Sequence, residues 1–311
     1  MYRVRTAVPR DLLGVIEMIT RLQADPAHHI AFHGETAEEV VEELAGLGGN
    51  WPTLAVVAVD RNDRLRGVLS VEVSKAQHRA FLYGPYVDVP ATHPAAGQLW
   101  QQTADALFAA AFRLPAMSGV SAVDLFGHRQ NRLLAEFATR HGILAGETSR
   151  LFTLTGSALL ALLGRTGDEP DRVVALPEDP AVRDAVVRLH DRCFPGAPTT
   201  GTELVAGTSG HTVVVLPGDG LLLGYAAGYT QAEEYYVDVV GVDPEVRGLG
   251  VGRLLIRRLL AVLAATGRRD RAAALVRVSN GASERMFTAL GFTSDTELVS
   301  YHREGAVLPA R

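Results

Sequence analysis

Cysteine is nearly absent from this sequence, and Cys193 carries the one thiol in its 311 residues. An internal disulfide is therefore excluded, and nothing in the composition indicates an oxidising compartment. We interpret Cys193 as a small buried apolar side chain rather than as a nucleophile, because free cysteines are among the most buried residues.

The sequence also lacks a long apolar run and an excess of basic residues. No stretch reaches the roughly 18 apolar residues of a membrane-spanning helix. The N-terminal MYRVRTAVPRDL has no apolar core of the kind found in signal peptides. The net charge of −5 argues against a nucleic-acid partner, because binding to phosphates needs a basic surface. We expect a cytoplasmic protein that binds neither a membrane nor a nucleic acid.

The most informative stretch is Val237–Leu263. Its apolar start fits a buried strand, which Asp243-Pro244 ends because proline cannot donate a hydrogen bond within a sheet. Next come Arg247-Gly248-Leu249-Gly250-Val251-Gly252 and then leucines at helical spacing. The glycines thus lie where a strand leads into a helix, whose unpaired N–H groups attract anions. Glycine lets a ligand approach the backbone and Arg247 and Arg253 add positive charge, so a pyrophosphate is the expected occupant.

Three kinds of phosphate loop compete for this stretch. A Walker-type loop needs Lys-Ser/Thr where Arg253-Leu254 stands, and a dinucleotide fingerprint needs a glycine at Arg253. The pattern Arg/Gln-x-x-Gly-x-Gly/Ala after a strand is matched in full by Arg247, Gly250 and Gly252. It resembles the acetyl-CoA loop of the Gcn5-related N-acetyltransferases (GNAT family). A glycine-rich turn without a ligand is the alternative.

The resemblance continues downstream of this helix. Leu275–Val278 reads as a strand, followed by Asn280, a short helix and Gly291-Phe292. In the family the asparagine usually bonds to the pantetheine arm of the cofactor, and the resemblance gives Asn280 that role. Its alternative role is a helix N-cap. The two segments together cover about half of the C-terminal domain.

The chain is long for one core, since domains average roughly 150 residues, and its two halves repeat one order of elements. The first half predicts strands and helices at Tyr2–Thr6, 9–22, Glu35–Leu47, Thr53–Asp60, Leu65–Val73, Phe81–Val89, Ala96–Phe112, Val120–Phe126, Gln130–Arg140 and Ser149–Thr155. The second predicts them at Arg172–Leu176, Asp179–Cys193, Thr202–Gly207, Thr212–Leu216, Leu221–Thr230 and Tyr235–Val242, before the segments above. We therefore expect an α/β protein of two tandem GNAT-like domains, each a mixed, mostly antiparallel sheet flanked by helices. The expected boundaries are 1–156, a linker at 157–170, and 171–311.

The two halves differ at the loop. The first domain has Pro94, Gly97 and Leu99 at the positions of the arginine and the two glycines. Proline removes both a cation and an N–H donor, and leucine places a side chain where backbone should meet phosphate. We expect the first domain to bind CoA poorly or not at all and to have a structural role.

The resemblance also implies the remaining cofactor contacts. In this family the central strand diverges from its neighbour, and backbone N–H groups there meet the thioester and the pantetheine, which places them at Val240 and Val242. The complete set of expected acetyl-CoA contacts is Val240, Gly241, Val242, Arg247, Gly248, Leu249, Gly250, Val251, Gly252, Arg253, Asn280 and Phe287. No metal is expected, because His28, His29 and His33 lack a further ligand at metal spacing. These histidines could line the substrate opening between the first two helices.

Carboxylates near the central strand are the expected general bases. Asp238 is the first candidate, because a carboxylate in an apolar run is costly unless a cleft solvates it or a partner pairs with it. Glu234 is the second, with Glu233 beside it, and an exposed or ion-paired strand carboxylate is the alternative. Tyr235 and Tyr236 could line the acceptor site or could simply pack.

The sequence departs from the family at the general acid. A tyrosine is usual at the position of Phe287, which has no proton to give. The remaining options are release of the thiolate to water, a hydroxyl from Ser279 or Ser283, or no catalysis.

The expected function is acetyl-CoA-dependent transfer of an acetyl group to the primary amine of a small molecule, by direct attack on the thioester in the C-terminal domain. A tandem enzyme resembling mycothiol synthase is a narrower option. The alternative is an acetyl-CoA-binding regulator or scaffold that is catalytically weak or inactive. We expect a monomer or a homodimer.

Overall fold

The computed structural model describes residues 2–47, 50–75, 77–90, 92–164, 172–197, 199–218, 221–231 and 233–305. The chain forms two compact units. Unit 1 comprises the residues up to Ser149 together with those from Glu297 onwards, and unit 2 comprises Arg150–Thr296. Both units have the expected mixed α/β architecture.

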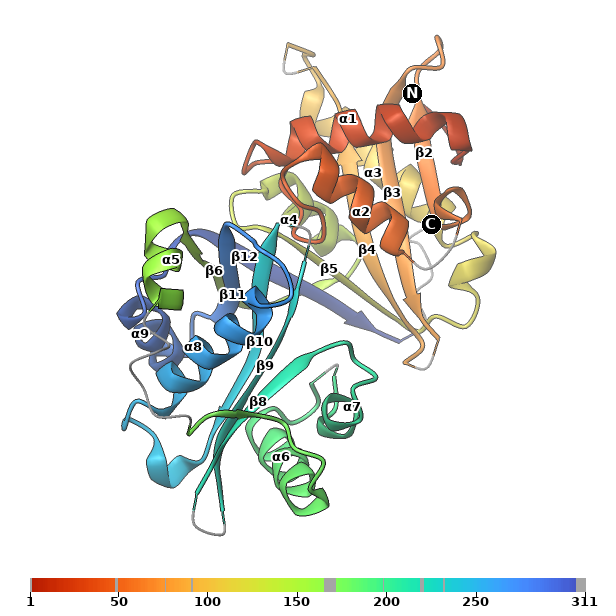
Figure 1. Ribbon diagram of the computed structural model, residues 1–311. Coiled ribbons are helices and arrows are strands. Elements are labelled where there is room, and N and C mark those ends of the chain that lie inside the picture. Colours follow the sequence, from red (N-terminus) through yellow and green to blue (C-terminus); the bar gives the residue numbers. More distant parts are fainter. Residues whose placement is uncertain are drawn as a thin grey trace. The chain divides into compact units, whose positions relative to one another are not determined.

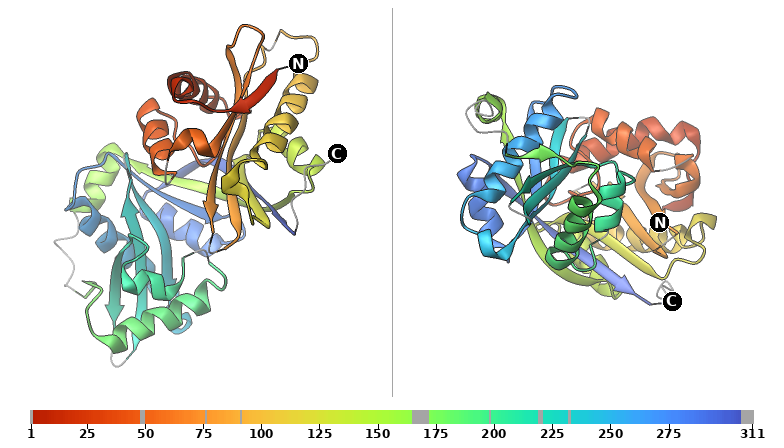
Figure 2. Two further views of the ribbon diagram at one scale, coloured as in Figure 1. Left: turned by 90° about the vertical axis from the view of Figure 1, so that its right-hand side faces the viewer. Right: turned by 60° about the horizontal axis from the view of Figure 1, so that its bottom comes forward.

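Unit 1 is a twisted sheet between two layers of helices. Its elements are β1 (Arg3–Thr6), α1 (Leu12–Gln23), α2 (Ala37–Gly46), β2 (Ala55–Val59), β3 (Leu65–Ser74), β4 (Arg79–Val87), α3 (Ala96–Ala111), β5 (Ala122–His128) and α4 (Arg132–Arg140), with short 3-10 turns at Pro9–Asp11, Trp51–Leu54 and Pro115–Met117. Strands β1 to β4 pair antiparallel, while β4 and β5 pair in parallel. Helices α1 and α2 lie on one face of the sheet and α3 lies on the other (Figure 2).

Unit 2 repeats this arrangement. Its elements are α5 (Gly156–Gly164), β7 (Val174–Ala175), α6 (Pro180–Cys193), α7 (Gly201–Ala206), β8 (Thr212–Pro217), β9 (Leu222–Thr230), β10 (Glu234–Val242), a 3-10 turn (Pro244–Val246), α8 (Val251–Ala264), β11 (Arg271–Arg277) and α9 (Gly281–Ala289). Strands β7 to β10 pair antiparallel, and β10 and β11 pair in parallel. Helix α8 covers one face of this sheet, and α6 and α7 cover the other (Figure 1).

The alternation of side chains along β9 and β10 explains these two layers. Tyr235 and Val237 face the core under α8, whereas Tyr225 and Ala227 face the core under α6 and α7. Successive residues of a strand point to opposite faces, so an apolar strand buried on both faces serves both helix layers. The strand therefore presents one set of side chains to each side of the unit.

The expected domain boundaries differ from the observed units at both ends. β12 (Thr293–Glu304) begins in unit 2, but its residues Leu298–Glu304 pair antiparallel with β5 and belong to unit 1. β6 (Leu144–Thr155) begins in unit 1, but Phe152 and Leu154 lie in the core of unit 2. β6 and β12 thus each begin in one unit and continue into the sheet of the other. The two units therefore divide the chain at other residues than the expected ends at 156 and 311.

The first part of the segment expected as a linker, 157–170, is helical. Residues 156–164 form α5, which places Leu159 and Leu162 in the core of unit 2. Residues 165–170 lie outside the described part of the chain. Burial of two leucines explains the helix, because leucine is both apolar and a strong helix former.

Candidate functional site

The turn between β10 and α8 has the backbone that its glycines predict. Gly248 and Gly250 have φ angles of 80° and 86°, a region that side chains with a Cβ disfavour. Gly250 is the residue before α8, and it accepts the first hydrogen bonds of that helix from the N–H groups of Arg253 and Leu254. The N–H groups of the preceding residues have no partner within the helix. The turn therefore leaves donors at the positive end of a 14-residue helix.

Gly252 also has a packing role. A Cβ at this position would lie 2.4 Å from Sδ of Met286, so the absence of a side chain lets α8 pack closely against α9. Leu249 is 75% exposed, and its side chain has no part in the turn.

Two arginines flank the turn. Nε of Arg247 donates to the carbonyl oxygen of Val242 at 3.1 Å, and its Nη2 lies 3.7 Å from Sγ of Cys193. Cys193 is half-buried rather than buried as expected. The side chain of Arg253 is exposed and extends over Gly250, since a Cβ on that glycine would lie 3.3 Å from Nη2 of Arg253. Both guanidinium groups thus lie beside the glycine turn.

Strands β10 and β11 separate partway along their length. β10 pairs with β9 as far as Val242, but its pairing with β11 covers only Glu234–Tyr236 opposite Arg271–Ala273. We call the region beyond these residues the β10–β11 fork. One edge of β10 is free of β11 there, so alternate residues of Val239–Val242 direct their backbone donors and acceptors to the gap between the strands, while the others face β9. Val240 and Val242 pack their side chains against the core under α8, as expected for residues that act only through the backbone.

Asp238 lies at a β-bulge at the start of the fork. The register of β10 against β9 shifts between Val237 and Val239, which leaves Asp238 as the extra residue. Such bulges re-aim side chains and are frequent beside active sites. Its Oδ2 lies 2.9 Å from Nε2 of His211, and one third of the side chain is exposed. The carboxylate is therefore both paired and accessible to solvent. Either condition reduces the cost of placing a carboxylate in an apolar strand.

His211 was missed by the sequence reasoning. It precedes β8, and 27 residues separate it from Asp238. Its ring meets the ring of Tyr229 edge-on, with ring centroids 5.0 Å apart. The ring centroids of Tyr229 and Tyr236 lie 5.3 Å apart. Burial raises the pKa of both tyrosines, and the negative charge of Asp238 adds to the effect, so both hydroxyls stay protonated. No sequence periodicity connects these four residues, because they come from three separate parts of the chain.

Glu234, predicted as catalytic, and Asn280, predicted as a cofactor contact, both have structural partners. Glu234 is buried, and its Oε2 lies 2.7 Å from Nε of Arg271, directly opposite on β11. Oδ1 of Asn280 accepts from the N–H of Ser283 at 3.1 Å, so Asn280 is the N-cap of α9. Glu233 precedes β10 and is exposed. Of the three predicted catalytic residues, Glu234 is buried and paired, whereas Asp238 and the half-buried Ser283 are accessible to solvent.

Phe287 belongs to an aromatic cluster in the core of unit 2. It is 4% exposed, and its ring lies 5.9 Å from that of Phe152 and 5.1 Å from that of Phe292. The position that usually carries a tyrosine hydroxyl is therefore filled by apolar packing. With 4% of the residue exposed, little of its surface is accessible for the expected cofactor contact.

Unit 1 has the same fork, but its own chain fills it. β4 and β5 pair only over Arg79–Phe81 and Ala122–Asp124. Beyond them, the N–H of Ala31 donates to Phe126 at 2.8 Å and the N–H of His128 donates to His29 at 3.1 Å, which gives a bridge between Ile30 and Gly127. Since β12 pairs along the other edge of β5, this segment lies on the edge that faces β4.

Gln23 fixes that segment in place. Its Nε2 donates to the carbonyl oxygens of Ile30 and His33 at 2.9 and 2.6 Å, and its Oε1 accepts from the N–H of Ile30 at 2.7 Å. The hydroxyl of Tyr86, from β4, also donates to Oε1 at 2.9 Å. Ile30 is completely buried. The histidines expected to line a substrate opening thus belong to a segment that closes the β4–β5 fork.

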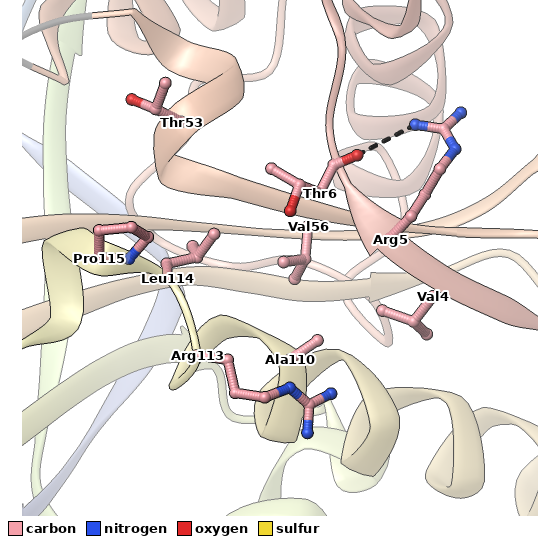
Figure 3. Close-up of a pocket in the computed structure, with 9 residues that line it drawn as sticks. All are labelled: Val4, Arg5, Thr6, Thr53, Val56, Ala110, Arg113, Leu114 and Pro115. Carbon is pink, nitrogen blue, oxygen red and sulfur yellow. Dashed lines mark hydrogen bonds between the residues drawn. The ribbon is translucent and has the colours of Figure 1, made fainter.

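The first loop of unit 1 also differs from its counterpart. Gly97 lies inside α3, and Ala95 precedes the helix with a φ of −120°, so the left-handed turn of unit 2 is not repeated. A cavity of about 440 Å³ does exist in unit 1, lined by residues of β1, β2 and the end of α3 (Figure 3). Arg5 and Arg113 are among its lining residues, but the guanidinium group of Arg5 is held by both carboxylate oxygens of Asp11 at 2.6 and 2.9 Å. This cavity is separate from the β4–β5 fork.

Metal and membrane features are not found within the described part of the chain. Its histidine, cysteine, aspartate and glutamate side chains form no group of three or more that could hold a metal ion. None of its helices is long and apolar enough to cross a membrane.

Comparison with known sequences agrees with the geometry of unit 2. The model of the Acetyltransferase (GNAT) family matches residues 183–292. The N-alpha-acetyltransferase RimI of Mycobacterium tuberculosis is 34% identical over 132 residues, which cover 40% of this chain and 79% of that protein. A mycothiol acetyltransferase of Thermobispora bispora is 46% identical over 67 residues, which cover 22% of each protein.

Comparison with solved structures extends the similarity to the whole chain. A GCN5-related N-acetyltransferase from Sphaerobacter thermophilus has a TM-score of 0.68 at 17% identity, covering 100% of this chain and 98% of that one. A tandem GNAT protein from the clavulanic acid biosynthesis pathway has a TM-score of 0.62 at 16% identity, covering 100% and 99%. At these identities the likeness concerns the fold of two successive units.

Proposed function

The chain belongs to the GNAT acetyltransferase family, and from this premise we propose that it transfers the acetyl group of acetyl-CoA to a primary amine of a small molecule in unit 2. The names of the two curated relatives refer to different acceptors, so we take from them only the shared acetylation. The observation that carries the proposal is the contrast between the two forks. In unit 2 a glycine turn at a helix N-terminus lies beside an open fork, whereas in unit 1 the fork is filled.

The residues of the turn fit a CoA diphosphate. The N–H groups of Val251 and Gly252 lie at the positive end of α8, and Arg247 and Arg253 supply two cations beside them. The left-handed Gly248 and Gly250 present backbone without a Cβ to the ligand. In the fork, the edge of β10 at Val240 and Val242 supplies backbone N–H groups for the pantetheine and for the acetyl oxygen.

Acetyl-CoA, when bound, supplies the acetyl group as a thioester. Asp238 accepts a proton from the incoming ammonium group, because its free carboxylate oxygen is accessible at the bulge where the fork begins. Phe287 cannot protonate the departing thiolate. Thiols have a pKa of about 8.5, so a thiolate is a tolerable leaving group near neutral pH without a dedicated acid.

Calorimetry with acetyl-CoA tests the location of the site. We expect one molecule bound per chain, and Gly250→Val should weaken binding at least about tenfold, because a β-branched residue at a φ of 86° displaces the turn at a cost of about 1–2 kcal/mol. Gly119→Val is the matched control: its φ is 82°, it lies in unit 1, and no atom lies within 4 Å of the added Cβ. Absence of binding to the wild-type chain, or two molecules per chain, contradicts the proposal.

A second candidate function is an acetyl-CoA-binding protein without turnover, which the burial of Phe287 favours. Release of CoA thiol with a panel of primary amines separates the two. Steady amine-dependent release excludes the inactive protein, and tight binding without release supports it.

A further inference from the structure

We propose that the cavity of unit 1 between β1, β2 and the end of α3 binds a small amphipathic carboxylate, a molecule with an apolar body and one anionic head group (Figure 3). The inference concerns unit 1 alone and does not depend on acetyl transfer in unit 2. It gives unit 1 a ligand-binding role, whereas its sequence indicated only a structural one.

The inner wall of the cavity is apolar. Thr6 pairs with Val56 across β1 and β2, so Val56 and Val4 lie on the same face of the sheet. Ala110, in the last turn of α3, and Leu114, just after it, line the cavity from the helix layer. Val56 is 1% exposed and Leu114 is 6% exposed, so both belong to the deep part of the wall. A volume of about 440 Å³ lies in the range of small-molecule sites, which are also mostly apolar.

Polar groups lie at the rim of the cavity. Thr6, Thr53 and Arg113 are its exposed polar lining residues. The hydroxyl of Thr53 donates to the carbonyl oxygen of Asn50 at 2.8 Å. The hydroxyl of Thr6 has no hydrogen-bond partner among the described residues, and Figure 3 shows it on the side of Thr6 that faces Val56. A free donor at the rim favours a ligand group that accepts hydrogen bonds.

Arg113 is the cation that remains for a ligand. Within the described part of the chain, its guanidinium group forms neither an ion pair nor a hydrogen bond. The guanidinium group of Arg5 is held by Asp11 and also donates to the carbonyl oxygen of Thr6 at 3.2 Å (Figure 3). None of the described residues that line the cavity is acidic. The cavity therefore selects an anion over a cation.

The residues around β1 add to this positive charge, although the whole chain has a net charge of −5. Arg3 and Arg10 both contact the carboxylate of Asp63, at 3.0 and 3.3 Å. One carboxylate thus serves two arginines, which leaves an excess of positive charge beside the cavity. An approaching anion is attracted by this excess.

The end of α3 does not oppose an anion. A helix C-terminus carries a partial negative charge on carbonyl oxygens that lack a partner. Here the carbonyl oxygens of Ala110 and Ala111 accept from the N–H groups of Arg113 and Leu114 at 3.0 and 2.9 Å. The side chain of Arg113 adds a full positive charge at the same end.

The distribution of these groups specifies the ligand. A carboxylate accepts from both the hydroxyl of Thr6 and the guanidinium group of Arg113, which can bind it through two parallel hydrogen bonds. An apolar body of several carbons displaces water from Val56 and Leu114. An alcohol lacks the charge that Arg113 attracts, and an ammonium group would be repelled by it. The ligand class is therefore a monocarboxylate with an apolar body.

The test compares phenylbutanoate with phenylbutanol, which has the same carbon skeleton and no charge. Methyl-labelled protein is titrated by nuclear magnetic resonance, with Val56 and Leu114 as reporters of the cavity and Val240 as the reporter of unit 2. We expect phenylbutanoate to shift the two cavity reporters but not Val240, with a dissociation constant of about 2 mM or lower. Phenylbutanol should bind about fivefold more weakly, because it makes no ion pair with Arg113.

Two substitutions test the head group and the apolar wall separately. Arg113→Gln should weaken phenylbutanoate binding about fivefold and leave phenylbutanol binding unchanged. Arg132→Gln is the matched control, because Arg132 is also an exposed arginine of unit 1 but lies outside the cavity. Ala110→Phe should abolish binding of both compounds, because its ring occupies the cavity. Thermal unfolding verifies that each variant is folded.

Three results overturn the inference. The first is an absence of shifts at Val56 and Leu114 in about 20 mM phenylbutanoate, which nearly saturates a site of the expected affinity. The second is equal binding of the acid and the alcohol, or an equal effect of Arg113→Gln and Arg132→Gln. The third is a shift of the same methyl groups on dilution without any probe, which shows that a second copy of the chain covers the cavity. Because Val240 reports on unit 2 separately, failure of acetyl-CoA to bind there removes the proposed function and leaves this test unaffected.

Discussion

Gln23 should be one of the most sensitive polar residues of unit 1. Its side chain is 2% exposed and makes three hydrogen bonds as a donor and two as an acceptor, with Ile30, His33, Gly34 and Tyr86. In Gln23→Ala the buried N–H of Ile30 loses its acceptor, the carbonyl oxygens lose their donor, and the hydroxyl of Tyr86 keeps only the longer bond of 3.4 Å to the carbonyl oxygen of Ile30. Each such group costs about 1–3 kcal/mol, so we expect the free energy of unfolding to fall by about 3–5 kcal/mol.

Urea unfolding followed by circular dichroism measures the change in the free energy of unfolding. Hydrogen exchange at the Ile30 amide shows whether the segment around Ile30 has left the β4–β5 fork. Gln23→Glu retains the acceptor but turns a carboxylate toward the carbonyl oxygens of Ile30 and His33. It should therefore destabilise at neutral pH at least as much as alanine does, because the donor is replaced by a charge.

Gln130→Ala is the matched control for this pair. Gln130 is exposed, and its backbone N–H rather than its side chain donates to His128. The free energy of unfolding should therefore change by no more than about 0.5 kcal/mol. A loss of less than about 1 kcal/mol in Gln23→Ala, with unchanged exchange at Ile30, would refute the reasoning that this side chain holds the fork closed.

Two further predictions concern pH and the aromatic core. Burial, with a smaller contribution from His128, lowers the pKa of His29 to about 4, so its stabilisation is complete above the unfolded pKa of about 6.5 and is lost as the pH falls toward 4. The free energy of unfolding should drop by about 2 kcal/mol between pH 7.5 and pH 5, and His29→Gln should lose most of this dependence in urea titrations at both pH values. Phe287→Tyr should lower stability by about 1–3 kcal/mol, because its hydroxyl enters the cluster with Phe152 and Phe292, and a thermal melt equal to wild type would contradict this.

The sequence allowed the order of elements to be predicted because each depends on local signals. The glycines before α8 and the aspartate that caps α6 act within a few residues of their own position. The paths of β6 and β12 were not predictable in this way. Two similar units offer each strand two similar sheet edges, and no local pattern distinguishes them.

The glycine turn of the candidate site could be predicted from the sequence. Of the pair formed by Asp238 and His211, only Asp238 could be predicted. Its place in an apolar run identified Asp238 as unusual, since a carboxylate in a buried strand needs a partner or solvent. Its partner His211 lies outside a strand and meets it only because β8, β9 and β10 are neighbours. The segment His29–Ala31 has no periodicity, so its entry into the fork depends on Gln23 and on the edge of β5 that β4 leaves free.

The different forks of the two units follow from the connections between their first two helices. In unit 1 the connection between Gln23 and Ala37 is long enough to reach β5, and Gln23 holds it there through Ile30. In unit 2 the connection between Cys193 and Gly201 is shorter, and the carbonyl oxygen of Thr199 is held at 2.9 Å by Nε2 of the buried His190.

His190 is in turn fixed from the sheet side. Its Nδ1 lies 2.7 Å from the hydroxyl of Tyr225 on β9, so the short connection is tied to α6 and to the sheet. The proposed loss of cofactor binding in unit 1 therefore has two independent causes, a loop without the glycine turn and a fork closed by the chain itself.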